Sequence, residues 1–141
     1  MTAMEKNMYL SVLRDKEIKI TPQRIGVLKI LKEGRRHFTV EDIYGEIKKA
    51  FPSISLATVY SILELFREKM LVQEIRIDFN RSRFEPRVDK HHHFLCSRCG
   101  EIFDIDIPEC PTLEKGKVGG HVIESHHGYF YGVCKNCVKE Q

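Results

Sequence analysis

Two matched cysteine pairs constrain the fold of this chain more than any other feature of its sequence. Each has the pattern Cys-x-x-Cys, formed by Cys96 with Cys99 and by Cys134 with Cys137. Such a turn presents two thiolates from one tight loop, and four thiolates form a preferred tetrahedral site for zinc. A redox-active motif or unrelated buried thiols are the alternatives, but two matching pairs favour zinc. Because four cysteines leave no open coordination position, we expect a structural and not a catalytic ion.

The 34 residues between the two pairs have the length of a small domain that zinc would close at its two ends. Short apolar runs there predict strands and one helix near residues 111–118. The expected strands are His93–Leu95, Glu101–Ile107, His121–His126 and Tyr129–Val133. The fifth cysteine, Cys110, has no partner at a suitable spacing, so we expect an ordinary small residue.

Charge and metal-binding residues are distributed unevenly along the chain. Residues 1–80 carry 14 Lys/Arg and 11 Asp/Glu, whereas residues 81–141 carry 9 of each. The five cysteines and every histidine except His37 lie in the second part. This difference predicts two domains, of which the first is mildly basic and a plausible partner for nucleic acid.

The first part has the pattern of four helices followed by a hairpin. Helix starts are expected at Thr21-Pro22, at a capping box from Thr39 to Asp42, and at Ser55 or Ala57. The first helix is expected over residues 4–16, and the second ends at Gly34. The buried face of the fourth helix is predicted to consist of Val59, Ile62, Leu63, Phe66 and Met70.

A strand over Leu71–Ile77, a turn over residues 78–82 and a returning strand over Arg83–Glu85 complete the first part. Helices followed by a β-hairpin are typical of the winged helix-turn-helix. We therefore predict an α+β protein with a winged-helix DNA-binding domain over residues 1–86 and a hinge over 87–90. A small α/β metal-binding domain is predicted over residues 91–141.

A second metal site is indicated by the run His91-His92-His93. In an extended chain His91 and His93 point to one face. Nearby carboxylates could complete the ligand set, namely those of Glu85, Asp89, Asp104 and Asp106. Nitrogen and oxygen ligands suit iron(II), manganese(II) or zinc(II) better than copper(I). The alternative is an incidental, solvated histidine cluster.

The chain contains no apolar stretch of membrane-spanning length and no signal-peptide core near its start. We therefore expect a cytoplasmic protein without a membrane partner. Five cysteines in such a protein indicate metal binding before disulfides.

Taken together, these residues resemble the Fur (ferric uptake regulator) family of iron, zinc, manganese and peroxide sensors, from about residue 8 to residue 137. The matching motifs are Ile20-Thr21-Pro22-Gln23-Arg24, His37-Phe38-Thr39, Asp42-Ile43-Tyr44, Ala57-Thr58-Val59-Tyr60, Arg83-Phe84-Glu85, His91-His92-His93, Cys96-Ser97-Arg98-Cys99-Gly100 and Tyr131-Gly132-Val133-Cys134 with Cys137. In this combination and order they are specific, although each motif alone would not be.

The resemblance implies a homodimeric repressor, not an enzyme, whose residues 91–141 form the dimerisation domain. It also implies that the dimer binds double-stranded DNA at an A/T-rich inverted repeat. It implies a regulatory site for Fe(II), Mn(II) or possibly Zn(II) formed by His37, Glu85, His91, His93 and Asp104. It also implies that the fourth helix enters the DNA major groove. Candidate DNA contacts are Arg24, Ser55, Ala57, Thr58, Tyr60 and Ser61. Tyr60 could instead be a packed helix residue, and Arg24 a solvated surface charge.

The sensed species is left open between iron and peroxide. Iron-sensing members usually have glutamate at the positions of both Glu85 and Asp104, peroxide-sensing members usually have aspartate at both, and this chain has one of each. In a peroxide sensor, bound iron(II) would lead to oxidation of His37 or His91 and release of DNA.

Other functions remain as alternatives. A zinc-uptake or manganese-uptake regulator of the same family would differ in the metal that permits DNA binding. A zinc enzyme is disfavoured because the chain lacks the His-x-Glu-x-x-His and deaminase-like patterns. A metal-storage or metal-chaperone module would leave the winged-helix half without a purpose.

Overall fold

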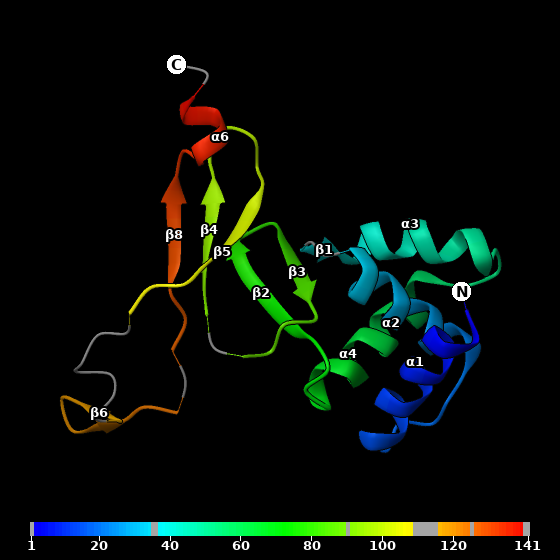
Figure 1. The fold of residues 1–141 in the computed structure, drawn as a ribbon. Helices are drawn as coiled ribbons and strands as arrows, with labels where there is room; N and C mark the ends of the chain where they lie inside the picture. Colours follow the sequence, from blue (N-terminus) through cyan, green and yellow to red (C-terminus); the bar gives the residue numbers. More distant parts are fainter. Residues whose placement is uncertain (1, 35–36, 90, 109–115, 125, 140–141) are drawn as a thin grey trace. The chain divides into compact units, whose positions relative to one another are not determined.

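The computed structural model describes residues 2–34, 37–89, 91–108, 116–124 and 126–139. The chain divides into two compact units, Met1–Val88 and Asp89–Gln141, which are described separately below. Figure 1 shows that the helices of the first unit precede its hairpin. Its elements are α1 (Ala3–Asp15), α2 (Pro22–Gly34), β1 (Phe38–Thr39), α3 (Val40–Ala50), α4 (Leu56–Glu68), β2 (Gln73–Asp78) and β3 (Arg81–Glu85).

Side-chain caps determine where these helices begin. The predicted capping box of α3 is present, with the Thr39 side chain accepting from the Asp42 N–H and the Asp42 carboxylate accepting from the Thr39 N–H. For α4 the cap is Ser55, whose Oγ accepts from the Thr58 N–H at 3.1 Å. Of the two starts considered for this helix, Ser55 is therefore the one observed.

The helices of the first unit enclose one hydrophobic core. Its centre contains fully buried side chains from α2, α3 and α4, including Leu28, Ile43, Val59 and Phe66. The prediction that Met70 joins the buried face of α4 was wrong, because its side chain is 60% exposed. Met70 follows the end of α4 with φ of +60°, and this left-handed turn directs the chain away from the helix axis.

The predicted hairpin is present as a three-stranded sheet with the order β1-β3-β2. β2 and β3 pair antiparallel, with Gln73 opposite Glu85 and Ile75 opposite Arg83. The turn is shorter than predicted, because β3 already begins at Arg81. The two-residue strand β1 was not predicted, and it pairs Phe38 with Phe84.

The second unit is built on a sheet with the order β5-β4-β8. Its elements are β4 (His92–Cys96), β5 (Ile102–Ile105), β6 (Lys117–Val118), β7 (His121–Val122), β8 (Tyr129–Gly132) and α6 (Lys135–Val138). The central strand β4 pairs antiparallel with β5 and parallel with β8. β6 and β7 form a separate two-stranded hairpin.

The sequence predictions for this unit need three corrections. Residues 117–118 form strand β6 and not the end of a helix, while residues 111–115 and Cys110 lie outside the described residues. The strand expected over 121–126 is only two residues long, because it pairs within a short hairpin. The short helix α6, which begins after Cys134, was not predicted.

Together the two units confirm the predicted fold class, a winged-helix unit followed by a small α/β unit with a four-cysteine cluster. None of the helices, within the part of the chain that the structure describes, has the length and hydropathy needed to cross a membrane.

Candidate metal sites

The parallel pairing of β4 with β8 brings the two Cys-x-x-Cys turns together. Cys96 ends β4 directly opposite Gly132 at the end of β8, and Cys134 follows two residues later as the N-cap residue directly before α6. The Ser97 backbone N–H donates to the Gly132 carbonyl at 2.7 Å, and the Ser97 hydroxyl donates to the same oxygen at 3.0 Å. These bonds fix one turn against the other.

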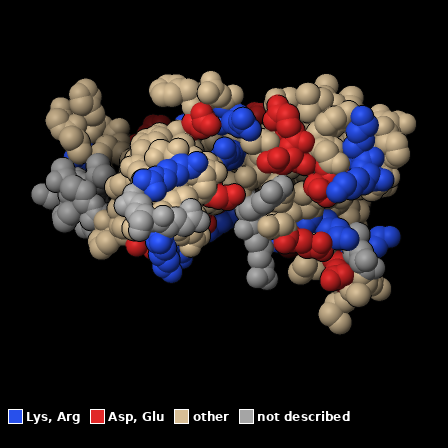
Figure 2. Space-filling view, turned by 90° about the horizontal axis from the view of Figure 1, so that it is seen from above, with Lys and Arg blue, Asp and Glu red and all other residues tan. Residues whose placement is uncertain are grey.

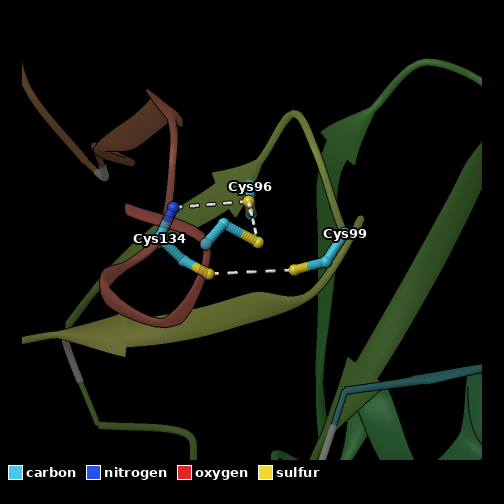
Figure 3. Close-up of side chains that lie close together, drawn as sticks. Cys96, Cys99 and Cys134 are labelled. Atoms are coloured by element: carbon cyan, nitrogen blue, oxygen red, sulfur yellow. Dashed lines mark hydrogen bonds between the residues drawn. The ribbon is translucent and has the colours of Figure 1, made fainter. Parts of the chain in front are cut away.

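The four sulfur atoms have the spacing of a zinc site. Cys96, Cys99, Cys134 and Cys137 are free cysteines whose Sγ atoms all lie within 4.8 Å of one another. The Cys96–Cys137 and Cys99–Cys134 sulfur pairs are 3.9 and 3.8 Å apart, and Figure 3 shows the sulfur atoms of its labelled cysteines directed toward one another. Four thiolates at about 2.3 Å from one zinc ion would be about 3.8 Å apart, so the cluster fits the ion.

Electrostatics within the cluster also favour a cation. Backbone N–H groups of Cys99 and Cys134 directed at the Cys96 sulfur lower the pKa of Cys96 to about 6. The hydrogen bond with the Cys134 thiol, together with burial, raises the pKa of Cys137 to about 12. Four adjacent thiols therefore cannot all ionise by themselves, whereas a divalent cation would stabilise all four thiolates.

In the first unit, the sheet places His37 beside Glu85. β1 pairs with β3 so that Phe38 is opposite Phe84, and this register directs the preceding His37 toward the following Glu85. His37 Nε2 lies 2.7 Å from Glu85 Oε2. The other carboxylate oxygen, Oε1, accepts a 2.6 Å hydrogen bond from the Gln73 side-chain amide.

Gln73 was missed by the sequence analysis. It has no ligand chemistry of its own, and its role follows only from the strand register that pairs it with Glu85. Its amide orients the carboxylate so that one oxygen faces His37, as outer hydrogen bonds orient metal ligands.

In the second unit, the sheet places two histidines beside one carboxylate. His93 is opposite Asp104 across the β4–β5 pair, so both side chains are on one face of the sheet. The Asp104 Oδ1 atom lies 3.3 Å from His91 Nε2 and 3.5 Å from His93 Nε2. His91 Nδ1 is also 2.7 Å from the backbone oxygen of Asp89, a contact that holds the ring in place.

The other metal-ligand candidates near the histidine run do not join the group formed by His91, His93 and Asp104. Asp106, one of the carboxylates considered for this site, falls beyond the end of β5 and is exposed. The ring of His92 lies near those of His126 and Phe130, with centroids 6.2 and 6.1 Å away. Asp89 offers its backbone oxygen to His91.

The predicted DNA-contact residues gather at the start of α4. Ser55, Ala57, Tyr60 and Ser61 are exposed and Thr58 is half-buried. Tyr60 is 50% exposed, which disfavours the alternative of a packed residue. The Ser61 hydroxyl donates to the Ala57 carbonyl at 3.1 Å. Apart from this group, the guanidinium of Arg24 donates to the Lys19 carbonyl at 2.7 Å.

Charge alone does not mark a DNA-binding face. In the space-filling view of Figure 2, Lys/Arg and Asp/Glu side chains are interspersed and form no continuous basic surface on the face shown. This distribution agrees with the net charge of only +3. On this face, contact with DNA would therefore depend on shape and on individual side chains.

Comparison with known proteins identifies the class to which this fold and these sites belong. Residues 15–137 match the sequence pattern of the "Ferric uptake regulator family". The chain is 36% identical over 143 residues to the "Peroxide operon regulator" of Bacillus subtilis, covering 100% of this chain and 99% of that protein. It is 35% identical over 132 residues to the "Peroxide-responsive repressor PerR" of Staphylococcus aureus, covering 91% and 88%.

A solved structure with the same fold is that of the Campylobacter jejuni peroxide stress regulator, with 32% identity and a TM-score of 0.65. It covers 97% of this chain and 100% of that one. The chain therefore belongs to the ferric uptake regulator family. These findings confirm the predicted function at the level of the family, that of a metal-sensing transcriptional repressor. Two solved relatives, a ferric uptake regulator of Pseudomonas aeruginosa with manganese and a zinc-bound manganese uptake regulator, agree with two of the predicted metals.

Proposed function

We propose that this protein binds operator DNA as a homodimer when a regulatory Fe(II) or Mn(II) ion is bound, and that it catalyses no reaction. In this proposal the four-cysteine cluster holds a structural zinc ion. The first unit binds DNA, the second unit forms the dimer, and the proposed DNA is an A/T-rich inverted repeat of two half-sites.

The observation that carries the proposal is that each unit holds its own group of potential metal ligands close together. The first unit supplies His37 and Glu85, and the second supplies His91, His93 and Asp104. Ligands bound at about 2.1 Å to one ion are about 3.0 Å apart in an octahedron and about 3.4 Å apart in a tetrahedron. The nitrogen–oxygen separations of 2.7, 3.3 and 3.5 Å within the units are close to these values.

The switch follows from dividing the ligands between two units. An ion held by both ligand groups would favour the arrangement in which the units present them to one point. It can shift the equilibrium only by the difference between its affinities for the two arrangements. That arrangement would set the two α4 helices of a dimer at the spacing of successive major grooves.

We further propose that the sensed species is peroxide. Relatives named for peroxide response cover nearly the whole chain. The geometry places His37 and His91 within 3.5 Å of a carboxylate that could hold iron, so both rings would be close to any oxidant formed there. Addition of one oxygen atom to either imidazole would remove a ligand and release DNA.

Fluorescence anisotropy on a labelled A/T-rich inverted repeat tests the metal switch. The zinc-loaded protein is titrated onto the duplex, first with chelator and then with Fe(II), Mn(II) or added Zn(II). The salt concentration is kept fixed because phosphate contacts make the affinity salt-dependent. We expect tight binding only with the second metal, and loss of that response in His91→Ala. His121→Ala, an exposed histidine of β7, is the matched control. If the protein binds the inverted repeat and random duplexes equally weakly with every metal, the metal-dependent switch is refuted.

Mass spectrometry tests peroxide sensing. The iron-loaded and manganese-loaded proteins are treated with peroxide, digested and compared. We expect one added oxygen on the peptide containing His37 or on the one containing His91, in the iron form only. Unmodified histidines in an iron form that still releases DNA would contradict this part of the proposal.

A second candidate is a manganese-uptake regulator. It is favoured by the resemblance to a solved "zinc-bound manganese uptake regulator", which is 25% identical with a TM-score of 0.65 and covers 89% of this chain. Anisotropy of the iron-loaded DNA complex before and after peroxide treatment separates the two, because a manganese-uptake regulator would stay bound to DNA and a peroxide sensor would be released.

A further inference from the structure

The tip of the β2–β3 hairpin carries an aromatic side chain that its own unit leaves uncovered. Phe79 lies in the turn between the two strands and has a relative exposure of 107%. A phenyl ring in water forgoes the free energy that its burial would provide. One exposed ring is common on protein surfaces, so its meaning depends on what surrounds it.

The surroundings of Phe79 combine the ring with positive charge. Arg81 is exposed two residues later, and its guanidinium forms no ion pair with any residue that the structure describes. The acidic neighbour Asp78 is held in the turn, where its Oδ1 accepts the Asn80 N–H at 3.0 Å. The tip therefore presents an apolar ring beside an unpaired guanidinium, a combination complementary to a surface that is both apolar and anionic.

The hairpin tip is also adjacent to the exposed face of α4. A groove lies between them, lined by Tyr60 on the helix side and by Asn80 and Arg81 on the hairpin side. Acidic residues line this groove as well. Two of these are neutralised locally, since Glu64 pairs with Arg67 and Glu74 with Arg76, and the third is Glu41.

We propose that Phe79 packs into the minor groove flanking each half-site while α4 occupies the neighbouring major groove, an inference that rests on the DNA-binding function proposed above. Apolar side chains enter minor grooves as wedges between base steps. The narrow minor groove of A/T-rich DNA has an enhanced negative potential that attracts arginine, and Arg81 would supply that contact. The ring would then select flanking base pairs that α4 does not touch.

Base-pair analogues in the flank test this contact. Inosine–cytosine pairs present the same minor-groove edge as A·T pairs, whereas G·C pairs add an amino group there. Duplexes with A·T, I·C or G·C pairs at each flanking position are titrated with the metal-loaded, full-length protein. The variants are Phe79→Ala, Phe79→Leu as the conservative replacement, and Met4→Ala as a control at another exposed position (82%).

We expect the unaltered protein to bind A·T and I·C flanks alike and G·C flanks more weakly. Phe79→Ala should weaken binding to the A·T flank by about tenfold and abolish the preference. Phe79→Leu should retain most of the affinity and most of the flank preference. Met4→Ala should retain both in full. Because Phe79 is exposed, circular dichroism should show that every variant folds.

Three results would overturn the inference. If Phe79→Ala keeps both affinity and flank preference while binding remains metal-dependent, the minor-groove contact is absent and the proposed function stands. If Phe79→Ala instead changes the sedimentation coefficient of the DNA-free protein, the ring is a contact between copies of the chain. If the unaltered protein binds no duplex with any metal, both the inference and the proposed function fail.

Discussion

Removal of the structural zinc should unfold the second unit and leave the first unit folded. The reason is the unequal distribution of buried apolar residues. Among the residues that the structure describes, 21 buried hydrophobic residues belong to the first unit, and the second has only Cys96, Ile102 and Cys134. Two of these three belong to the proposed zinc cluster, so Ile102 is the one buried aliphatic side chain among the described residues of the second unit.

The free energies of side-chain burial and of zinc binding show which unit depends on the ion. Complete burial of an isoleucine contributes about 1.5–3 kcal/mol, whereas binding of a structural zinc ion contributes about 10–16 kcal/mol in small zinc domains at neutral pH. Within one chain the second unit therefore depends on the ion for most of its stability. The core of the first unit contains no residue of the cysteine cluster, and it should keep its structure.

Hydrogen exchange of the zinc-loaded and chelator-treated proteins provides the assay. The amides of His93 and Ser97, which donate to the carbonyls of Gly128 and Gly132 on the β8 side, should lose protection without zinc. Helix α2 should retain its protection. Cys137→Ser should reproduce the effect of the chelator, and Cys110→Ser should control for loss of a thiol. Equal protection of His93 and Ser97 with and without zinc would refute the reasoning.

The remaining predictions concern the first unit. Thr39→Ala should destabilise the protein by about 1 kcal/mol in urea unfolding because it removes the cap of α3, and Thr39→Ser should not. Gly45→Ala should stabilise by about 0.5–1 kcal/mol, because a Cβ there meets nothing within 4 Å. Gly26→Ala should lower the thermal midpoint, because its Cβ would lie 2.6 Å from Ile47 Cδ1; equal midpoints for the two variants would contradict the packing argument. Leu63→Ala should cost about 2–5 kcal/mol in guanidinium unfolding, since Leu63 is 1% exposed, and a loss below 1 kcal/mol would contradict it.

Local sequence predicted the first unit well because its structure depends on local interactions. Thr39 and Asp42 satisfy each other's backbone groups within one turn, so the start of α3 is determined by four consecutive residues. Met70 shows the limit of this reasoning. Helical spacing placed it inside, but α4 ends at Glu68 and the positive φ of Met70 turns its side chain outward.

The second unit was predicted less accurately because its elements are short and pair over long distances. β7 has two residues, and no period can be recognised in so short a strand. The cysteine spacing indicated the zinc cluster, yet it could not reveal the parallel pairing of Cys96 with Gly132 that assembles it. In the same way, Gln73 became visible as a partner of Glu85 only through the strand register.

The distribution of the proposed regulatory ligands explains why a sensor would use two units instead of one complete site. A site complete within one unit would bind its ion equally well in every arrangement of the units, and equal affinity shifts no equilibrium. His37 with Glu85 offers two ligands, and His91, His93 and Asp104 offer three. Neither set alone fills an octahedral ion, so the affinity gained by combining them exists in one arrangement only. Because the coupling free energy of typical allosteric proteins is about 1–3 kcal/mol, even a modest gain from the first unit's two ligands would suffice for the proposed switch. Oxidation of His37 or His91 would remove part of that gain and leave the structural zinc cluster unchanged.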